Sequence, residues 1–153
     1  MGNKLVIRDM VEEDIPWIID IELNSFSTPW SEQSFINEIY KKYAITRVAE
    51  FESLIIGYIS VNYFSYEAHL LNLAVHKDYR RMGVATALMN NILPELKKKG
   101  CVFIYLEVRA SNTGAQKFYE NFGFKVQSIR KKYYGNPDED AFLMMARIND
   151  GLN

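Results

Sequence analysis

The chain has 153 residues, of which 48% are hydrophobic and 24% charged, and its formal net charge at pH 7 is −1. This length and composition predict one folded domain over residues 1–153, with a core that needs neither a metal nor a disulfide. The near-zero charge argues against direct nucleic-acid binding, which needs a basic face, and the lack of a long apolar stretch predicts a cytoplasmic protein that does not enter a membrane.

The first third of the chain predicts one strand and two helices. Residues 5–8 have strand character, and residues 11–24 place isoleucine and leucine side chains on one helical face. Ser31 is a good N-cap for a second helix with apolar side chains at helical spacing. Between the two helices we expect an aromatic loop that Pro29 interrupts.

The middle of the chain predicts three strands and a helix. Residues 43–50, 54–64 and 68–75 are rich in β-branched and aromatic residues, and the turns between them are short. We therefore expect three antiparallel strands. Residues 85–96 carry leucine and isoleucine at helical spacing, and Pro94 is expected to kink this helix.

The last third predicts a strand, a short helix and a terminal hairpin. The strand covers residues 102–108, the helix residues 113–121, and the hairpin residues 124–132 and 141–148 around a loop at 133–140. Together the elements predict an α/β fold in which helices flank both faces of a mixed sheet.

A basic, glycine-containing turn precedes the long helix. It consists of Arg80, Arg81, Met82, Gly83, Val84, Ala85 and Thr86. The first N–H groups of a helix have no partner within it, so together with the helix dipole they favour a phosphate, which Gly83 would let approach closely. The spacing fits neither a P-loop nor a G-x-G-x-x-G fingerprint. Taken alone, the turn could equally be a solvated surface connection.

Two downstream segments complete a recognisable pattern. Residues 107–112 read Glu-Val-Arg-Ala-Ser-Asn, and residues 118–124 read Phe-Tyr-Glu-Asn-Phe-Gly-Phe. With the turn at residues 80–85, written Arg-x-x-Gly-x-Ala, they resemble the GNAT superfamily of N-acetyltransferases. The segments Ser-Thr-Pro-Trp-Ser at 27–31 and Arg-Lys-Lys-Tyr-Tyr at 130–134 resemble its RimI-type subfamily, which acetylates protein N-termini. The resemblance runs from Ile7 to about Met145.

The resemblance implies that acetyl-CoA is the co-substrate and that the whole turn at residues 80–86 holds its pyrophosphate. It also implies that the strand containing Leu73, Ala74 and Val75 pairs its backbone with the pantetheine arm, and that one N–H of this strand stabilises the carbonyl oxygen. Asn112 would hold the cofactor arm from the start of the next helix. No metal is expected, because His69 and His76 have no metal-ligand spacing and Cys101 suits a buried apolar position.

The resemblance assigns the general base to Glu107 and the general acid to Tyr119. Partial burial at the end of a strand is expected to raise the pKa of Glu107 from about 4.3 toward neutrality, whereas an ion pair with Arg109 would lower it. A phenol with a pKa near 10 can protonate a leaving thiolate. The alternative for Tyr119 is that it is one more core aromatic, as we expect for Phe118 and Phe122.

The subfamily resemblance places the amine substrate between the loops at residues 26–30 and 133–140. Phe26 and Trp30 would line one side, and Tyr133 and Tyr134 would bind the first peptide bond. Glu139 or Asp140 would attract the ammonium group. The two tyrosines could equally form a packed cross-strand ladder.

The sequence therefore predicts an enzyme that acetylates an N-terminal alanine or serine, with the tail of a ribosomal protein as the expected partner. A small-molecule amine or a lysine side chain is an alternative acceptor, because a fold does not fix a substrate. A non-catalytic acyl-CoA-binding module is a second alternative. The sequence gives no indication of the oligomeric state.

Overall fold

The computed structural model describes residues 4–148, so the predicted domain at 1–153 extends beyond it at both ends. The strands are β1 (Leu5–Asp9), β2 (Ala44–Phe51), β3 (Leu54–Phe64), β4 (Glu67–Val75), β5 (Phe103–Arg109), β6 (Lys125–Tyr134) and β7 (Glu139–Arg147). The helices are α1 (Ile15–Ser25), α2 (Glu32–Tyr40), α3 (Val84–Lys98) and α4 (Thr113–Glu120), with short 3₁₀ turns at Glu12–Asp14 and Lys77–Tyr79.

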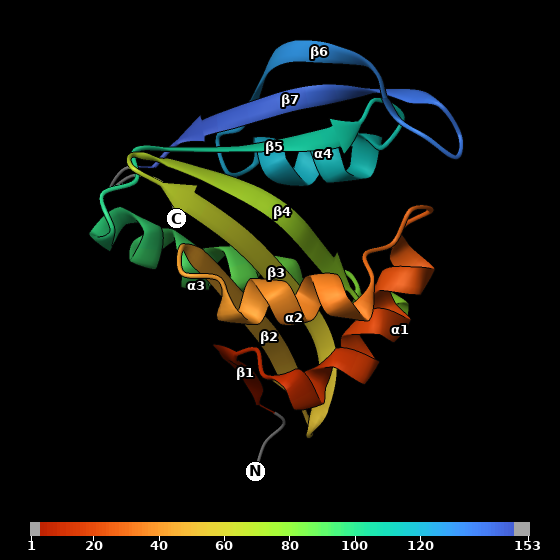
Figure 1. Cartoon of the computed structure of the whole chain (residues 1–153), viewed down its shortest axis with the longest axis vertical. Helices are drawn as coiled ribbons and strands as arrows, with labels where there is room; N and C mark the ends of the chain where they lie inside the picture. Colours follow the sequence, from red (N-terminus) through yellow and green to blue (C-terminus); the bar gives the residue numbers. More distant parts are fainter. Residues whose placement is uncertain (1–3, 149–153) are drawn as a thin grey trace.

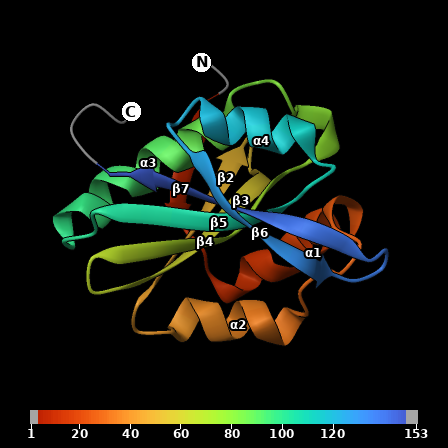
Figure 2. The same cartoon turned by 90° about the horizontal axis from the view of Figure 1, so that it is seen from above.

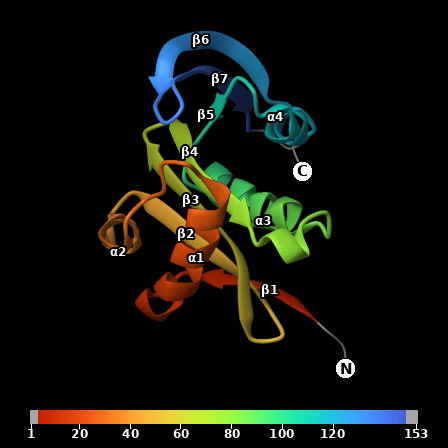
Figure 3. The ribbon, with the colours of Figure 1, turned by 90° about the vertical axis from the view of Figure 1, so that its right-hand side faces the viewer.

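The described strands form one mixed sheet in the order β1-β2-β3-β4-β5-β7-β6. Every neighbouring pair is antiparallel except β4 and β5, which are parallel. Helices α1 and α2 lie on one face, and α3 and α4 on the other (Figures 2 and 3). The predicted α/β architecture with helices on both faces is confirmed.

Two groups of buried side chains hold the helices to the sheet. Under α1 and α2, Ile18 and Phe35 pack in one cluster with Tyr58 of β3, and all three side chains are fully buried. Under α3, Leu88 and Ile92 are also fully buried and belong to the larger core. That larger core also takes in Cys101 and the aromatic residues at 119, 122 and 124, which brings α4 and the turn after it onto the same face.

Strands β4 and β5 separate soon after they begin to pair. Their ladder joins only Glu67–His69 to Phe103–Tyr105, and beyond it the two strands diverge (Figure 1). On its other edge, β4 pairs Leu70 with Val61 and Asn72 with Ser60, so Leu71 is an additional, bulged residue. The far half of β4 therefore has one edge that no strand of the described sheet covers.

Several element boundaries differ from the sequence prediction. Helix α1 begins at Ile15, after a 3₁₀ turn, because Pro16 suits the first helical turn rather than the interior. Helix α3 continues past Pro94 to Lys98, so the proline does not end it. Tyr133 and Tyr134 end β6 and are not in the hairpin loop as predicted. Among the described residues, no helix is both long and apolar enough to span a membrane.

Candidate functional site

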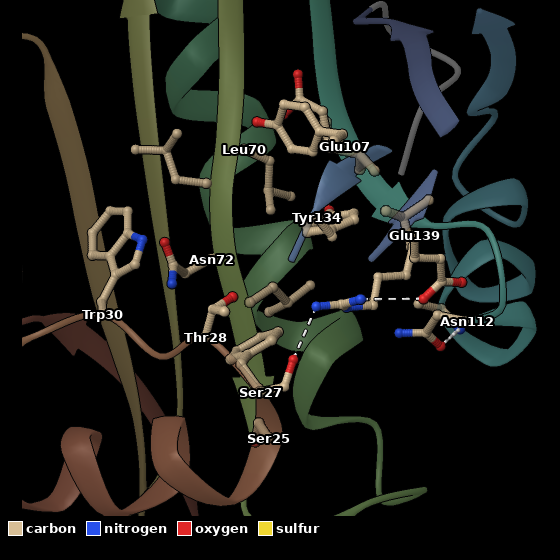
Figure 4. A pocket seen from close by; sticks show the side chains of 18 of the residues that line it. Ser25, Ser27, Thr28, Trp30, Leu70, Asn72, Glu107, Asn112, Tyr134 and Glu139 are labelled. Carbon is tan, nitrogen blue, oxygen red and sulfur yellow. Dashed lines mark hydrogen bonds and ion pairs between the residues drawn. The ribbon is translucent and has the colours of Figure 1, made fainter. Parts of the chain in front are cut away.

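The divergence of β4 and β5 opens a cavity of about 610 Å³. In Figure 4, Trp30, Thr28 and Asn72 lie on one side of it, and Glu107, Tyr134 and Glu139 on the other. The cavity brings together most of the predicted catalytic and substrate residues, namely Phe26, Trp30, Glu107, Tyr119, Tyr133, Tyr134 and Glu139, and two of the predicted cofactor residues, Leu73 and Asn112. Segments far apart in the sequence thus meet in one space.

The basic turn is not part of this cavity wall, but it adjoins it. The Nε of Arg80 donates to the Val75 carbonyl at 3.0 Å, and its Nη2 lies 3.4 Å from Oγ of Ser25, which lines the cavity. Ala74 and Val75 are buried outside the wall, so of the three predicted β4 residues only Leu73 faces the cavity.

The turn meets the chemical requirements for a pyrophosphate. Gly83 is the N-cap of α3 with a φ of +79°, and the first α3 hydrogen bond runs from Ala87 N–H to the Gly83 carbonyl at 2.9 Å. The N–H groups of residues 84–86 therefore precede the helical ladder and lie at the positive end of the helix dipole. With the uncovered edge of β4 beside it, this region fits an anionic cofactor with an extended arm.

We expect a substitution at Gly83 to weaken cofactor binding, whereas the same substitution at Gly100 serves as a matched control. Both residues have positive φ, and a Cβ added to either would have no atom within 4 Å. Gly83→Ala and Gly100→Ala should therefore each lose about 1 kcal/mol of stability. Only Gly83→Ala should weaken acetyl-CoA binding, by about tenfold, because its methyl group fills space that a phosphate would approach. Calorimetric binding and thermal melting test this, and an equal loss of affinity in both variants would contradict it.

Glu107 is held in the cavity by two basic side chains. Its Oε1 lies 2.7 Å from Nε2 of His69, and its Oε2 lies 3.9 Å from Nε of Arg130. Burial raises the pKa of Glu107, but the hydrogen bond and charge of His69, together with Arg130, outweigh burial and lower it overall. The expectation of a raised pKa was wrong. The alternative of an ion pair with Arg109 is not observed either, because Arg109 pairs with Glu139.

From the sequence, His69 was considered only as a metal ligand, yet the structure places it against Glu107. Its ring also stacks on Tyr105 with centroids 4.3 Å apart. His69 and Tyr105 are register partners in the short parallel ladder, and Glu107 is two residues further along the same strand. No sequence signal indicated this contact, because it depends on β4 and β5 being neighbours.

Tyr119 lies at the base of the cavity on α4. The side chain is 8% exposed, and its ring packs at 5.3 and 5.5 Å from those of Phe118 and Phe124. Burial, and secondarily Tyr134, raises the pKa of Tyr119. The phenol therefore keeps its proton at neutral pH and can act as a hydrogen-bond donor. Tyr119 belongs to the core and also lines the cavity. Packing in the core therefore does not exclude a role as general acid.

Asn112 and Asp140 have local structural contacts. Oδ1 of Asn112 accepts the Ala115 N–H at 3.1 Å and so caps α4, although the residue also lines the cavity. Asp140 accepts the Lys132 N–H at 2.8 Å and lies outside the cavity lining, so of the two predicted acidic residues only Glu139 faces the cavity.

A buried polar cluster behind the first loop was not predicted. Glu22 is 1% exposed and accepts hydrogen bonds from the Tyr58 hydroxyl, from the Trp30 N–H at 2.9 Å and from the Asn72 amide at 3.3 Å. Burial raises the pKa of Glu22, and these hydrogen bonds oppose it. The cluster fixes the loop at residues 26–30 against β4. The sequence signal that could have predicted this cluster is a carboxylate on the otherwise apolar face of α1.

Comparisons with known proteins agree with this geometry. The acetyltransferase (GNAT) family model matches residues 15–124. The ribosomal protein bS18-alanine N-acetyltransferase of Escherichia coli K12 is 35% identical over 94% of this chain and 97% of its own length. A Bacillus subtilis protein provisionally given the same activity is 34% identical over 98% of this chain and 100% of its own length. The crystal structure of the E. coli ribosomal-protein-S18-alanine N-acetyltransferase is similar with a TM-score of 0.87 and 31% identity, covering 98% of this chain and 99% of that one.

Proposed function

The chain belongs to the acetyltransferase (GNAT) family of acetyl-CoA-dependent N-acetyltransferases, and we propose that it acetylates the N-terminal alanine of a ribosomal protein of the bS18 type. The observation that carries the proposal is the cavity. Glu107 and Tyr119 both line it, together with residues from the loops at 26–30 and 133–140. The similarity to bS18-alanine N-acetyltransferases over nearly the whole chain supports this acceptor. The proposal assigns the activity to one domain and to the cytoplasm, where ribosomal proteins are made.

The residues have distinct roles in the proposed reaction. Acetyl-CoA supplies the acetyl thioester. The N–H groups of residues 84–86 and the side chains of Arg80 and Arg81 would hold its pyrophosphate, and the uncovered edge of β4 would hold its pantetheine arm. Backbone N–H groups on that edge would also donate to the thioester oxygen.

Proton transfer would use Glu107 and Tyr119, which both line the cavity. A peptide α-ammonium has an ordinary pKa of about 7.7–8.0, so it must lose a proton before it attacks. Glu107, charged at neutral pH and hydrogen-bonded to His69, would bind the amine and accept that proton. The Tyr119 phenol, which keeps its proton at neutral pH, would donate to the leaving thiolate.

The proposal is tested with thiol release from acetyl-CoA against short peptides that begin with free Ala, Ser, Met or Gly. The same peptides, blocked at the α-amine but carrying lysine, serve as the matched set. We expect turnover of the free Ala peptide, with Ser second, and none of the blocked peptides. Turnover of the blocked peptides alone would make lysine the acceptor. Binding of acetyl-CoA without turnover of any peptide would leave a small amine or a binding module as the function.

A further inference from the structure

Arg109 lines the cavity and donates four hydrogen bonds. Its Nη1 donates to the Pro137 carbonyl at 3.0 Å and to Glu139 Oε1 at 3.2 Å. Its Nη2 donates to the Gly135 carbonyl at 2.8 Å and to Ser27 Oγ at 2.9 Å. The Arg109 side chain is 19% exposed, and of these hydrogen bonds the one to Glu139 is partly buried. Hydrogen bonds from a charged donor are stronger than those between neutral groups.

These contacts join two segments that the sheet does not connect. Ser27 belongs to the loop after α1, whereas residues 135–139 form the turn between β6 and β7 and the start of β7. The β4–β5 ladder ends at His69 and Tyr105, so no strand pairing holds the cavity walls together at the level of Arg109. Figure 4 labels Ser27 and Glu139, the two side chains that Arg109 joins through hydrogen bonds of 2.9 and 3.2 Å.

The chemistry of the site requires arginine. The planar guanidinium offers donors in several fixed directions, and it lies 4.5 Å from the centroid of the Tyr134 ring. Its partner Glu139 is fixed in turn, because Glu139 Oε2 accepts the Ser111 N–H at 2.6 Å. A lysine ammonium could replace one of these contacts but could not bridge both walls and lie over the tyrosine.

We propose that Arg109 is a positioning residue for the peptide substrate, which fixes the distance between the loop at residues 26–30 and the β6–β7 turn. In this role Arg109 acts through the two segments that it joins, and Glu107 and Tyr119 carry the proton transfers. The inference rests on the proposed function, because only a peptide that enters between these two segments would depend on their spacing.

The test compares kcat and KM in Arg109→Gln, Arg109→Lys and Ser27→Ala. For Arg109→Gln we expect the KM for an alanyl peptide to rise about tenfold, while kcat and the KM for acetyl-CoA stay within about threefold. Arg109→Lys should show the same rise in peptide KM as Arg109→Gln. Ser27→Ala, which removes one acceptor from an exposed loop, should raise the peptide KM about threefold. In a fourth variant, Arg109→Ala, guanidinium added at millimolar concentration should replace the missing group and restore the peptide KM.

Arg8→Gln is the matched control. Arg8 also joins separate segments, through Asp14 at 2.8 Å and Glu50 at 2.9 Å, but it lies outside the cavity lining. An unchanged peptide KM in Arg109→Gln, or an equal rise in Arg8→Gln, would overturn the inference while the wild type still acetylates peptides. A wild type that binds acetyl-CoA and acetylates no peptide would instead refute the proposed function, and the inference with it. If Arg109→Gln does not fold, Ser27→Ala decides by the same KM criterion.

Discussion

Replacing Glu107 with glutamine is expected to lower kcat/KM for an alanyl peptide by about 100-fold or more, with little change in acetyl-CoA affinity. Glutamine keeps the shape of the side chain and can still contact His69, but a neutral amide cannot accept a proton. Steady-state kinetics with peptide and acetyl-CoA varied separately measure both effects.

The pH profile tests the same residue. His69 and Arg130 outweigh burial and hold the pKa of Glu107 below its ordinary value, so the side chain stays charged at neutral pH. We therefore expect wild-type kcat/KM to rise through pH 7–8 with loss of the proton from the substrate ammonium, whose pKa is about 7.7–8.0. An inflection near pH 6–7 that disappears in Glu107→Gln would show that the pKa of Glu107 is raised instead.

Glu95→Gln provides the control for Glu107→Gln. Glu95 is on α3 and pairs with Arg47, so it is also a carboxylate held by a basic side chain, but it does not line the cavity. We expect this variant to keep wild-type kinetics. A loss of less than threefold in Glu107→Gln would remove Glu107 from proton transfer and favour a solvent base.

Replacing Tyr119 with phenylalanine is expected to lower kcat by about 100-fold, because the leaving thiolate loses its hydrogen-bond donor. The ring contacts with Phe118 and Phe124 survive the change, so thermal stability should change little. Single-turnover measurements separate this chemical step from product release.

A change of acyl donor distinguishes protonation from packing at Tyr119. If the phenol assists departure of the thiolate, the defect of Tyr119→Phe should shrink with an acetyl thioester whose thiol is more acidic, because that group leaves without help. Tyr63→Phe is the control, since Tyr63 packs edge-on against Tyr43 and lies outside the cavity lining. An equal defect with both donors would assign Tyr119 to the core alone.

Local features of the structure were largely predictable from the sequence. Ser31 caps α2 as expected, by accepting the Ser34 N–H at 3.1 Å, and the apolar spacing of α3 predicted the buried positions Leu88 and Ile92. The basic turn with Gly83 also forms the predicted helix N-terminus. Each of these depends on residues within a few positions of one another, where hydrogen bonding and side-chain periodicity determine the conformation.

The electrostatics of the site could not be predicted in the same way. From the sequence we expected burial to raise the pKa of Glu107, and Arg109 was the alternative partner because the two residues are close in the chain. In the structure, Glu107 instead contacts His69 and Arg130. Arg109 contacts Ser27 and residues 135–139. The direction of the Glu107 pKa shift reversed for this reason, since a pKa depends on neighbours in space.

The sequence by itself determined the family, the order of the elements and the basic turn that precedes α3, because these follow from short motifs and from periodicity. Only the tertiary structure decided where β4 and β5 separate, which side chains meet across the opening and how His69 and Arg109 hold its walls. The physical reason is that strand pairing brings together residues tens of positions apart, and the resulting distances, burial and charges have no counterpart along the chain.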